Sequence, residues 1–242
     1  MVQRKFSNTT NFELQDRAVF LAVLIVVAGT WGFVALADKM VEGRVETFDE
    51  WGIRSLRRPE DAAVLIGPRW VAEAVRHVTD LGGESVLIYV NLAVAGGFVV
   101  RRKFNALAYV VAAVVGGLLL MLLLKECFAR PRPQVVPYLC AVTGSSFPSG
   151  HSMMSAVVYL TLGILLASGI ARWRFKLVLL ALALLLAGLV GVSRVCLGVH
   201  YPTDVLAGWT AGLVWATFCW LLARKLKRRT GEATRVLNIE TE

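Results

Sequence analysis

The chain of 242 residues is 57% hydrophobic and only 18% charged, a composition that excludes an ordinary soluble domain of this size. Its net charge of +9 does not indicate a nucleic-acid partner, because the basic residues form separate clusters between long uncharged runs.

These uncharged runs are long enough to be membrane spans. A helix needs roughly 20 apolar residues to cross about 30 Å of hydrocarbon. Six runs reach or approach that length once their flanks are counted: residues 18–37, 85–100, 106–124, 153–171, 177–192 and 205–223. The sequence therefore predicts an all-α, polytopic membrane protein with six transmembrane helices. The first run has no small-x-small cleavage site that closes it cleanly, so we expect it to be retained as a helix.

The connection between the first two spans, residues 38–84, contains ten acidic and seven basic residues. Its stretches FDEWGIRSLRRPED (48–61) and GPRWVAEAVRHV (67–78) place tryptophans and valines among charges at near-helical spacing. That pattern is typical of helices that lie at a headgroup boundary. We predict a short interfacial helical segment here, with His77 as a solvated surface residue.

The distribution of basic residues predicts the orientation in the membrane. Basic clusters occupy alternate connections and the tail, at residues 101–103, 172–176 and 224–229. The positive-inside rule puts these clusters and both termini in the cytoplasm. Segments 38–84, 125–152 and 193–204 then lie outside, and a bacterial inner membrane fits this arrangement.

The four cysteines are too few for a disulfide scaffold. Cys219 lies in a membrane segment and is predicted to pack as a small apolar residue. Cys127, Cys140 and Cys196 fall at the outer end of the bundle. An oxidised pair could form there, and the sequence does not choose its partners.

Two outer segments carry charges close to hydrocarbon, where unpaired charges are costly. KECFARPRP (125–133) follows an uncharged run directly, and SRVCLGVHYPTD (193–204) lies between two such runs. One alternative is that the cations only snorkel at helix ends. These segments and the turn before the fourth span together hold two of the three histidines, which favours a functional site.

The cationic and glycine-containing residues suit a phosphate group. Lys125, Arg132 and Arg194 supply three positive charges, and the two guanidinium groups match phosphate oxygens. Ser149, Gly150 and His151 begin a helix, where free backbone N–H groups favour an anion. The lack of a side chain at Gly150 lets the backbone approach that anion.

His200 and Asp204 are four residues apart, with Pro202 between them at the expected start of a helix. The carboxylate can hold one imidazole nitrogen and leave the other as a nucleophile. His151 is then free to protonate a leaving oxygen. Asp204 alone would be an ordinary stabiliser of a helix N-terminus. Beside His200, it is interpreted as part of a phosphoryl-transfer site.

These residues resemble the type-2 phosphatidic acid phosphatase superfamily, which has the pattern KxxxxxxRP, then PSGH, then SRxxxxxHxxxD. Every motif position is present here, and Pro133, Pro148 and Ser193 complete the three motifs. The resemblance covers roughly residues 80–222, within a single domain that we expect to span residues 1–242.

The resemblance implies a six-helix membrane phosphatase with an outer active site and no metal or cofactor. By analogy, the phosphate-binding residues are Lys125, Arg132, Ser149, Gly150 and Arg194. His200 would form a phosphohistidine, Asp204 would orient it, and His151 would act as general acid. Arg130 is off the pattern, and its only suggested use is to steer an anionic headgroup.

The expected function is hydrolysis of a lipid phosphate such as undecaprenyl diphosphate, phosphatidylglycerophosphate or phosphatidic acid. The expected partners are that lipid and the bilayer, with no nucleic acid. A lipid A phosphatase and a phosphotransferase using the same site are alternatives that the sequence does not separate. A transporter is disfavoured, because it would need charges near the middle of the membrane, where Asn91 is the strongly polar residue.

Overall fold

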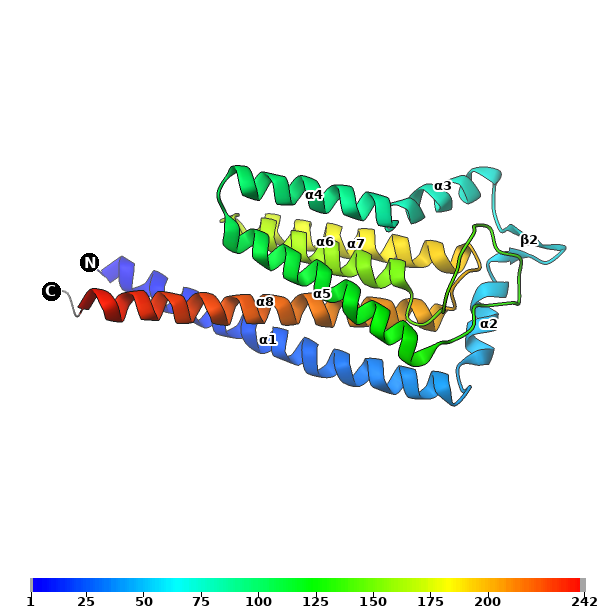
Figure 1. The fold of residues 1–242 in the computed structure, drawn as a ribbon, viewed down its shortest axis with the longest axis horizontal. Helices are drawn as coiled ribbons and strands as arrows, with labels where there is room; N and C mark the ends of the chain where they lie inside the picture. Colours follow the sequence, from blue (N-terminus) through cyan, green and yellow to red (C-terminus); the bar gives the residue numbers. More distant parts are fainter. Residues whose placement is uncertain (1, 240–242) are drawn as a thin grey trace.

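The computed structural model describes residues 2–239, with side-chain positions for residues 16–229. Long helices run side by side along most of the molecule (Figure 1). They are α1 (Val2–Val41), α4 (Glu84–Val100), α5 (Phe104–Phe128), α6 (Gly150–Ser168), α7 (Trp173–Cys196) and α8 (Pro202–Ile239). The shorter elements α2 (Glu46–Arg54), β1 (Arg57–Arg58), β2 (Asp61–Leu65) and α3 (Arg69–Asp80) all lie between α1 and α4.

The predicted polytopic membrane fold is confirmed, with one qualification on the second span. Five helices in the described residues are long and apolar enough to cross a membrane on their own. The second predicted span is α4, which has 17 residues and reaches membrane length only together with α3. The two helices form a pair bent by 45°, so the six-span count depends on this broken helix.

The purely helical prediction for residues 48–61 is wrong in its second half. Residues after Arg54 form a two-stranded antiparallel hairpin, in which Arg57 pairs with Leu65. Pro59 lacks a backbone N–H and disfavours a continued helix, and the Asp61 carboxylate accepts a bond from the backbone N–H of Ala63 at 2.9 Å. The hairpin projects beyond the end of the helices in Figure 1.

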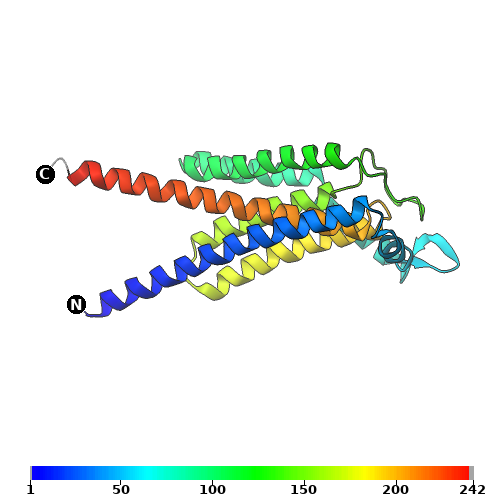
Figure 2. The same cartoon turned by 90° about the horizontal axis from the view of Figure 1, so that it is seen from below.

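The direction of the helices brings the three predicted outer segments to one end of the molecule. Both termini lie at the opposite end, as the two views in Figures 1 and 2 agree. The connection from α5 to α6 and the turn from α7 to α8 therefore meet beneath α2. This end of the bundle holds every motif residue named above.

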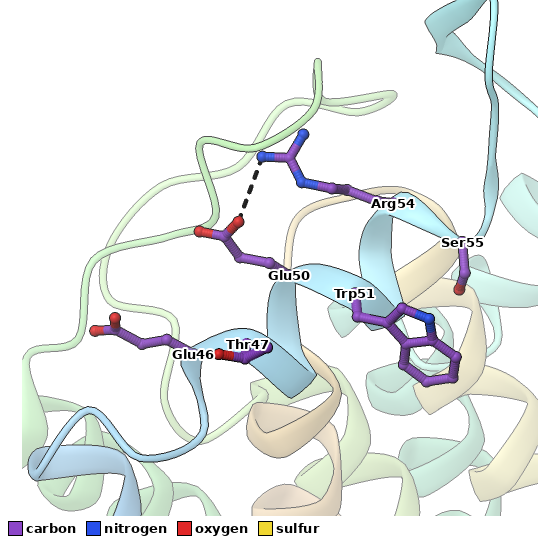
Figure 3. Close-up of a pocket in the computed structure, with 6 residues that line it drawn as sticks. All are labelled: Glu46, Thr47, Glu50, Trp51, Arg54 and Ser55. Atoms are coloured by element: carbon purple, nitrogen blue, oxygen red, sulfur yellow. Dashed lines mark hydrogen bonds and ion pairs between the residues drawn. The ribbon is translucent and has the colours of Figure 1, made fainter.

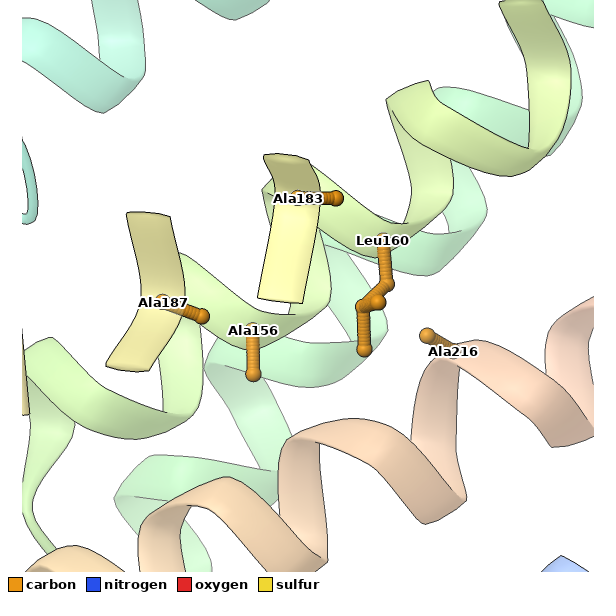
Figure 4. Packing of buried hydrophobic residues seen from close by; sticks show 5 residues of the cluster. All are labelled: Ala156, Leu160, Ala183, Ala187 and Ala216. Atoms are coloured by element: carbon orange, nitrogen blue, oxygen red, sulfur yellow. The ribbon is translucent and has the colours of Figure 1, made fainter. Parts of the chain in front are cut away.

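The bundle packs around α6, which contacts α5, α7 and α8. Its centre consists mainly of alanines, so the helices approach closely (Figure 4). The cluster comprises Ala156, Leu160, Ala183, Ala187 and Ala216. Large aliphatic side chains such as Leu119 and Leu185 remain exposed on the outer faces of α5 and α7. That distribution suits a protein surrounded by lipid, where small residues mediate helix contacts.

Two glycines on α8 lie close to backbone atoms at the start of α6 and of the residue that caps it. A Cβ on Gly208 would lie 2.7 Å from the carbonyl oxygen of Ser149. A Cβ on Gly212 would lie 2.6 Å from the carbonyl oxygen of Met153. Because these neighbours are backbone atoms, neither glycine can gain a side chain unless the helices separate.

We therefore expect Gly212→Ala to lower the stability of the bundle by about 1–3 kcal/mol, the usual cost of overpacking a core. The matched control is Gly188→Ala on α7, where an added Cβ meets nothing within 4 Å. The measurement is the unfolding midpoint of the two purified variants in detergent. Equal midpoints for the two variants would contradict the close approach of α6 and α8.

All four cysteines lie in the described part of the chain, and all four are free. No disulfide therefore links Cys127, Cys140 or Cys196 in this structure. Cys219 is buried, as predicted for an apolar packing residue, and His77 is exposed on α3, also as predicted.

Candidate active site

The three motif segments converge at the end of the bundle where α2 lies. Lys125 is in the last turn of α5 and Arg194 in the last turn of α7. Arg132 lies in the connection between α5 and α6, whereas His151 is in the first turn of α6. Asp204 is in the first turn of α8, immediately after the loop that contains His200.

His200 and Asp204 form a buried pair at the centre of this end. The His200 side chain is 2% exposed and that of Asp204 is fully buried. His200 Nδ1 lies 3.4 Å from Asp204 Oδ2, close enough for an ion pair but not aligned as a hydrogen bond. Catalytic hydrogen bonds are often this long before a substrate binds.

The neighbours of His200 define its tautomer. The guanidinium Nη1 of Arg132 lies 3.2 Å from His200 Nε2. Arginine can only donate hydrogen bonds, so this contact requires a lone pair on Nε2 and places the ring hydrogen on Nδ1. Nδ1–H then faces the Asp204 carboxylate. The arrangement leaves Nε2 as the nitrogen that can attack a ligand.

The pKa of His200 also favours a neutral ring. Burial is the main cause that lowers this pKa, the Asp204 carboxylate opposes the shift, and the positive charges of Arg132 and Arg194 add to it, so that the pKa lies at about 4. Burial acts in this direction because it disfavours the charged imidazolium. At neutral pH, His200 is therefore uncharged and carries a lone pair on Nε2.

Asp204 is fixed from several directions. Its Oδ2 accepts hydrogen bonds from the Ser146 hydroxyl at 2.5 Å and from the backbone N–H of Tyr201 at 2.8 Å. Its Oδ1 accepts a bond from Arg130 Nη1 at 2.7 Å. The bond to the Tyr201 amide is the one expected of a residue that stabilises a helix N-terminus. Asp204 therefore stabilises the start of α8 and also faces His200.

Three cations surround the pair and are held by neutral groups. Lys125 Nζ donates to the carbonyl of Ser145 at 2.6 Å, and Arg194 Nη1 donates to the Thr79 hydroxyl at 3.0 Å. Arg132 donates to three backbone carbonyls, those of Thr143, Gly144 and Val199.

The charge of this cluster is not neutralised by these contacts. Within residues 16–229, Lys125, Arg132 and Arg194 form no ion pair with a carboxylate. The Nε of Arg194 is buried and has no hydrogen-bond partner among the described residues. Such an arrangement favours an anionic ligand, because an unpaired buried cation is costly.

The start of α6 contributes less to a phosphate site than the sequence suggests. The Ser149 hydroxyl caps the helix by accepting from the backbone N–H of Ser152, and the Ser149 N–H donates to the carbonyl of Asp204 at 3.0 Å. This amide is therefore engaged. The amides of Gly150 and His151 are the first two of the helix, where no earlier turn supplies an acceptor. A Cβ on Gly150 would lie 3.5 Å from Lys125 Cε, so Lys125 closely approaches this helix end.

The remaining motif residues have structural positions. Ser193 is buried and its hydroxyl donates to the carbonyl of Val190 at 2.6 Å, within its own helix. Pro133 and Pro148 are buried, and the Phe147–Pro148 peptide bond is cis. Phe147 packs between Phe33 and Phe128, with ring centroids 5.9 and 5.0 Å away. These contacts hold the loop that carries Ser146 and Ser149.

Sequence reasoning missed Ser146 and Asp49 at the site, and it gave Arg130 only a suggested use in headgroup steering. Both terminal nitrogens of Arg130 are engaged, one by Asp204 and the other by Asp49 on α2 at 2.8 Å. Headgroup steering by Arg130 is therefore not supported. Its position two residues before Arg132 is a weak signal, and Ser146 precedes the PSGH motif. Nothing in the local sequence around Asp49 singles it out.

An open hollow lies on the exposed face of α2, away from these buried side chains (Figure 3). It is lined by Glu46, Thr47, Glu50, Trp51, Arg54 and Ser55. Glu50 and Arg54 form an ion pair there, with both side chains about half exposed. Asp49 is fully buried on the same helix, so α2 presents one face to solvent and another to the site.

Comparison with known proteins gives a consistent result. Residues 105–228 match the family model of the PAP2 superfamily. Phosphatidylglycerophosphatase B of Bacillus subtilis is 38% identical over 184 residues, which cover 75% of this chain and 86% of that protein. Lipid A 1-phosphatase of Rhizobium etli is 32% identical over 127 residues, covering 46% of this chain and 50% of that protein.

A solved structure agrees with the fold. The crystal structure of a transmembrane PAP2-type phosphatidylglycerolphosphate phosphatase from Bacillus subtilis matches with a TM-score of 0.75 and 32% identity. The match covers 84% of this chain and 98% of that chain. Fold and relatives together define a membrane lipid phosphatase. The chain belongs to the PAP2 superfamily, which confirms the resemblance inferred from the three motifs.

Proposed function

We propose that this chain removes the phosphate monoester of phosphatidylglycerophosphate through a phosphohistidine at His200. The observation that carries the proposal is the neutral, buried His200, whose Nε2 lone pair lies against cations that have no carboxylate partner. The Bacillus subtilis relatives that share most of this chain's length support the choice of lipid.

In the first step, His200 Nε2 attacks phosphorus, and the bond from phosphorus to the lipid oxygen breaks. His151 donates a proton to that leaving oxygen. Lys125, Arg132 and Arg194 hold the phosphate oxygens and stabilise the charge that develops on them. These three cations also act on His151, and a bound phosphate offsets part of their charge, which favours a protonated His151 in the complex. Asp204 stabilises the positive charge that develops on the His200 ring.

In the second step, a water molecule attacks the phosphorus of the phosphohistidine and the phosphorus–nitrogen bond breaks. His151 now accepts a proton from that water, reversing its earlier role. Inorganic phosphate leaves, and His200 returns to its neutral form. The net reaction consumes one water for each lipid alcohol and phosphate released.

The experiment is phosphate release by the purified protein from a panel of lipids in mixed micelles. We expect the highest kcat/KM with phosphatidylglycerophosphate, compared with phosphatidic acid, undecaprenyl diphosphate and lipid A. The His200→Ala variant provides the background. A higher kcat/KM with the diphosphate or with lipid A would reassign the substrate, and no release from any lipid would overturn the proposal.

We further propose that the site faces outward from a bacterial inner membrane, with both termini in the cytoplasm. Support comes from the basic junctions at residues 101–103 and 172–176, which lie at the end of the bundle opposite the site. Basic residues near span ends prefer the cytoplasmic side.

The orientation predicts that His77→Cys reacts with an impermeant thiol reagent in intact cells, whereas Lys103→Cys reacts only after lysis. Both variants are made in a chain whose four native cysteines are replaced by serine and whose activity is retained. The native cysteines are removed because all four are free. The reverse labelling pattern would place the site in the cytoplasm.

A further inference from the structure

Asp49 is a fully buried carboxylate that no motif includes. It lies on α2, outside the residues 105–228 that match the family model. Burial of a carboxylate is costly unless it is paired and hydrogen-bonded. Here its Oδ2 accepts from Arg130 Nη2 at 2.8 Å and from the Thr203 hydroxyl at 2.5 Å. Its Oδ1 accepts from the backbone N–H of Thr203 at 3.0 Å.

These contacts lead directly to Asp204. Arg130 lies between the two buried carboxylates, binding Asp49 with one terminal nitrogen and Asp204 with the other. The guanidinium carbon also lies 4.2 Å from the centre of the Tyr201 ring, so its plane is fixed on a third side. Removal of Asp49 would leave Arg130 without one of the two groups that set its position.

Thr203 provides a second connection, because it precedes Asp204 in the first turn of α8. The Asp49 carboxylate accepts the Thr203 backbone N–H, one of the amides that a helix start leaves without an internal partner. The packing there is close, since a Cβ on Gly52 of α2 would lie 2.5 Å from Pro202 Cγ. Helix α2 therefore holds the first turn of α8, which carries Asp204, in place.

We infer that Asp49 is a positioning residue for the reaction, acting through Arg130 and Thr203 to hold Asp204 against His200. This inference rests on the proposed function, because it requires Asp204 to orient His200. It assigns a role in turnover to the outer segment between α1 and α4. Asp49 touches neither the substrate nor the reacting atoms in this account, so its effect should fall on kcat and not on KM.

The test combines Asp49→Asn with Asp204→Asn in a double-mutant cycle on the purified protein. Displacement of a catalytic group from its working geometry can cost up to about 10²-fold. Asp49→Asn in the parent chain is expected to lower kcat roughly ten- to a hundredfold while leaving KM nearly unchanged. In the Asp204→Asn background, the same change is expected to have almost no further effect, because its route to His200 is already lost.

The matched control is Glu50→Gln, the next residue on α2, which pairs with the exposed Arg54 (Figure 3). This variant should keep the parent kcat. If Asp49→Asn does not fold, Arg130→Lys takes its place, because a lysine keeps the charge but lacks the two-armed fork that bridges the carboxylates.

The outcomes distinguish a failure of the role inferred for Asp49 from a failure of the role proposed for Asp204. Non-additive losses in kcat support the positioning role. Equal losses in both backgrounds, a change in KM alone, or full activity of Asp49→Asn would overturn it. If Asp204→Asn itself retains full activity, the proposed use of Asp204 fails, whatever Asp49 does.

Discussion

Replacing His200 with alanine is expected to abolish turnover and to remove the phosphorylated enzyme at the same time. The loss in kcat should be on the order of 10⁶-fold, the scale produced when a covalent nucleophile is removed. All three histidines lie in the described part of the chain, and His200 alone faces a carboxylate that fixes its tautomer. A replacement nucleophile would need the same neutral, oriented lone pair beside the cations.

The measurement is the amount of labelled phosphate that stays bound to the protein after treatment with acid and after treatment with base. A phosphohistidine is labile in acid and stable in base, so the label should survive only the base treatment. The matched control is His77→Ala, which removes the exposed histidine of α3. This variant should retain both turnover and the formation of the phosphorylated enzyme. A labelled protein that persists in His200→Ala would contradict the assignment. The mechanism would then have to be rebuilt around His151.

The long apolar helices could be predicted from the sequence because lipid imposes a simple requirement on length and composition. The break between α3 and α4 could not. At this junction, a Cβ on Gly82 would lie 2.2 Å from Val190 Cγ1 of α7, so the bend depends on a contact between distant segments. The hairpin after α2 was not predicted either. Its two strands, residues 57–58 and 61–65, are short and have no alternating apolar pattern, so the sequence carries no clear strand signal there.

The motif residues could be placed from spacing alone, because their elements all end or begin at the same end of the bundle. The surrounding network could not, since it joins segments far apart in the chain. Arg130 and Asp49 are 81 positions apart, and their pairing depends on how α2 lies across the helix ends. The hydrogen bond of the Ser149 amide could not be predicted for the same reason, because its acceptor is the carbonyl of Asp204 on another helix.

The network also explains why the cations of this site are held by neutral oxygens. A carboxylate beside Lys125, Arg132 or Arg194 would compete with the phosphate for the same positive charge. The two buried carboxylates, Asp49 and Asp204, are instead paired with Arg130. In the proposed mechanism, the ion-pair network that orients His200 is thus separate from the positive charges that bind the phosphate.

The His151→Ala variant should respond differently to the leaving group from the His200→Ala variant. If His151 protonates the departing oxygen, its loss should lower kcat on a lipid or simple alkyl phosphate by about 10²–10⁴-fold, the usual contribution of general acid catalysis. An aryl phosphate with an activated leaving group needs little protonation, so the decrease in kcat of His151→Ala on this substrate should be much smaller. The phosphoenzyme should still form from the aryl substrate.

This difference between substrates separates a proton donor from a residue that only binds phosphate. His151 lies in the first turn of α6 beside the cationic cluster, so its removal could also weaken binding of the phosphate group itself. Weaker binding would raise KM equally for alkyl and aryl substrates, because both present the same phosphate. Lys125→Met provides the matched comparison, since it removes a charge proposed to bind phosphate without removing the proposed proton donor for the leaving oxygen. Equal losses in kcat/KM on both substrates for His151→Ala, as for Lys125→Met, would exclude His151 as the general acid and leave it as a binding residue.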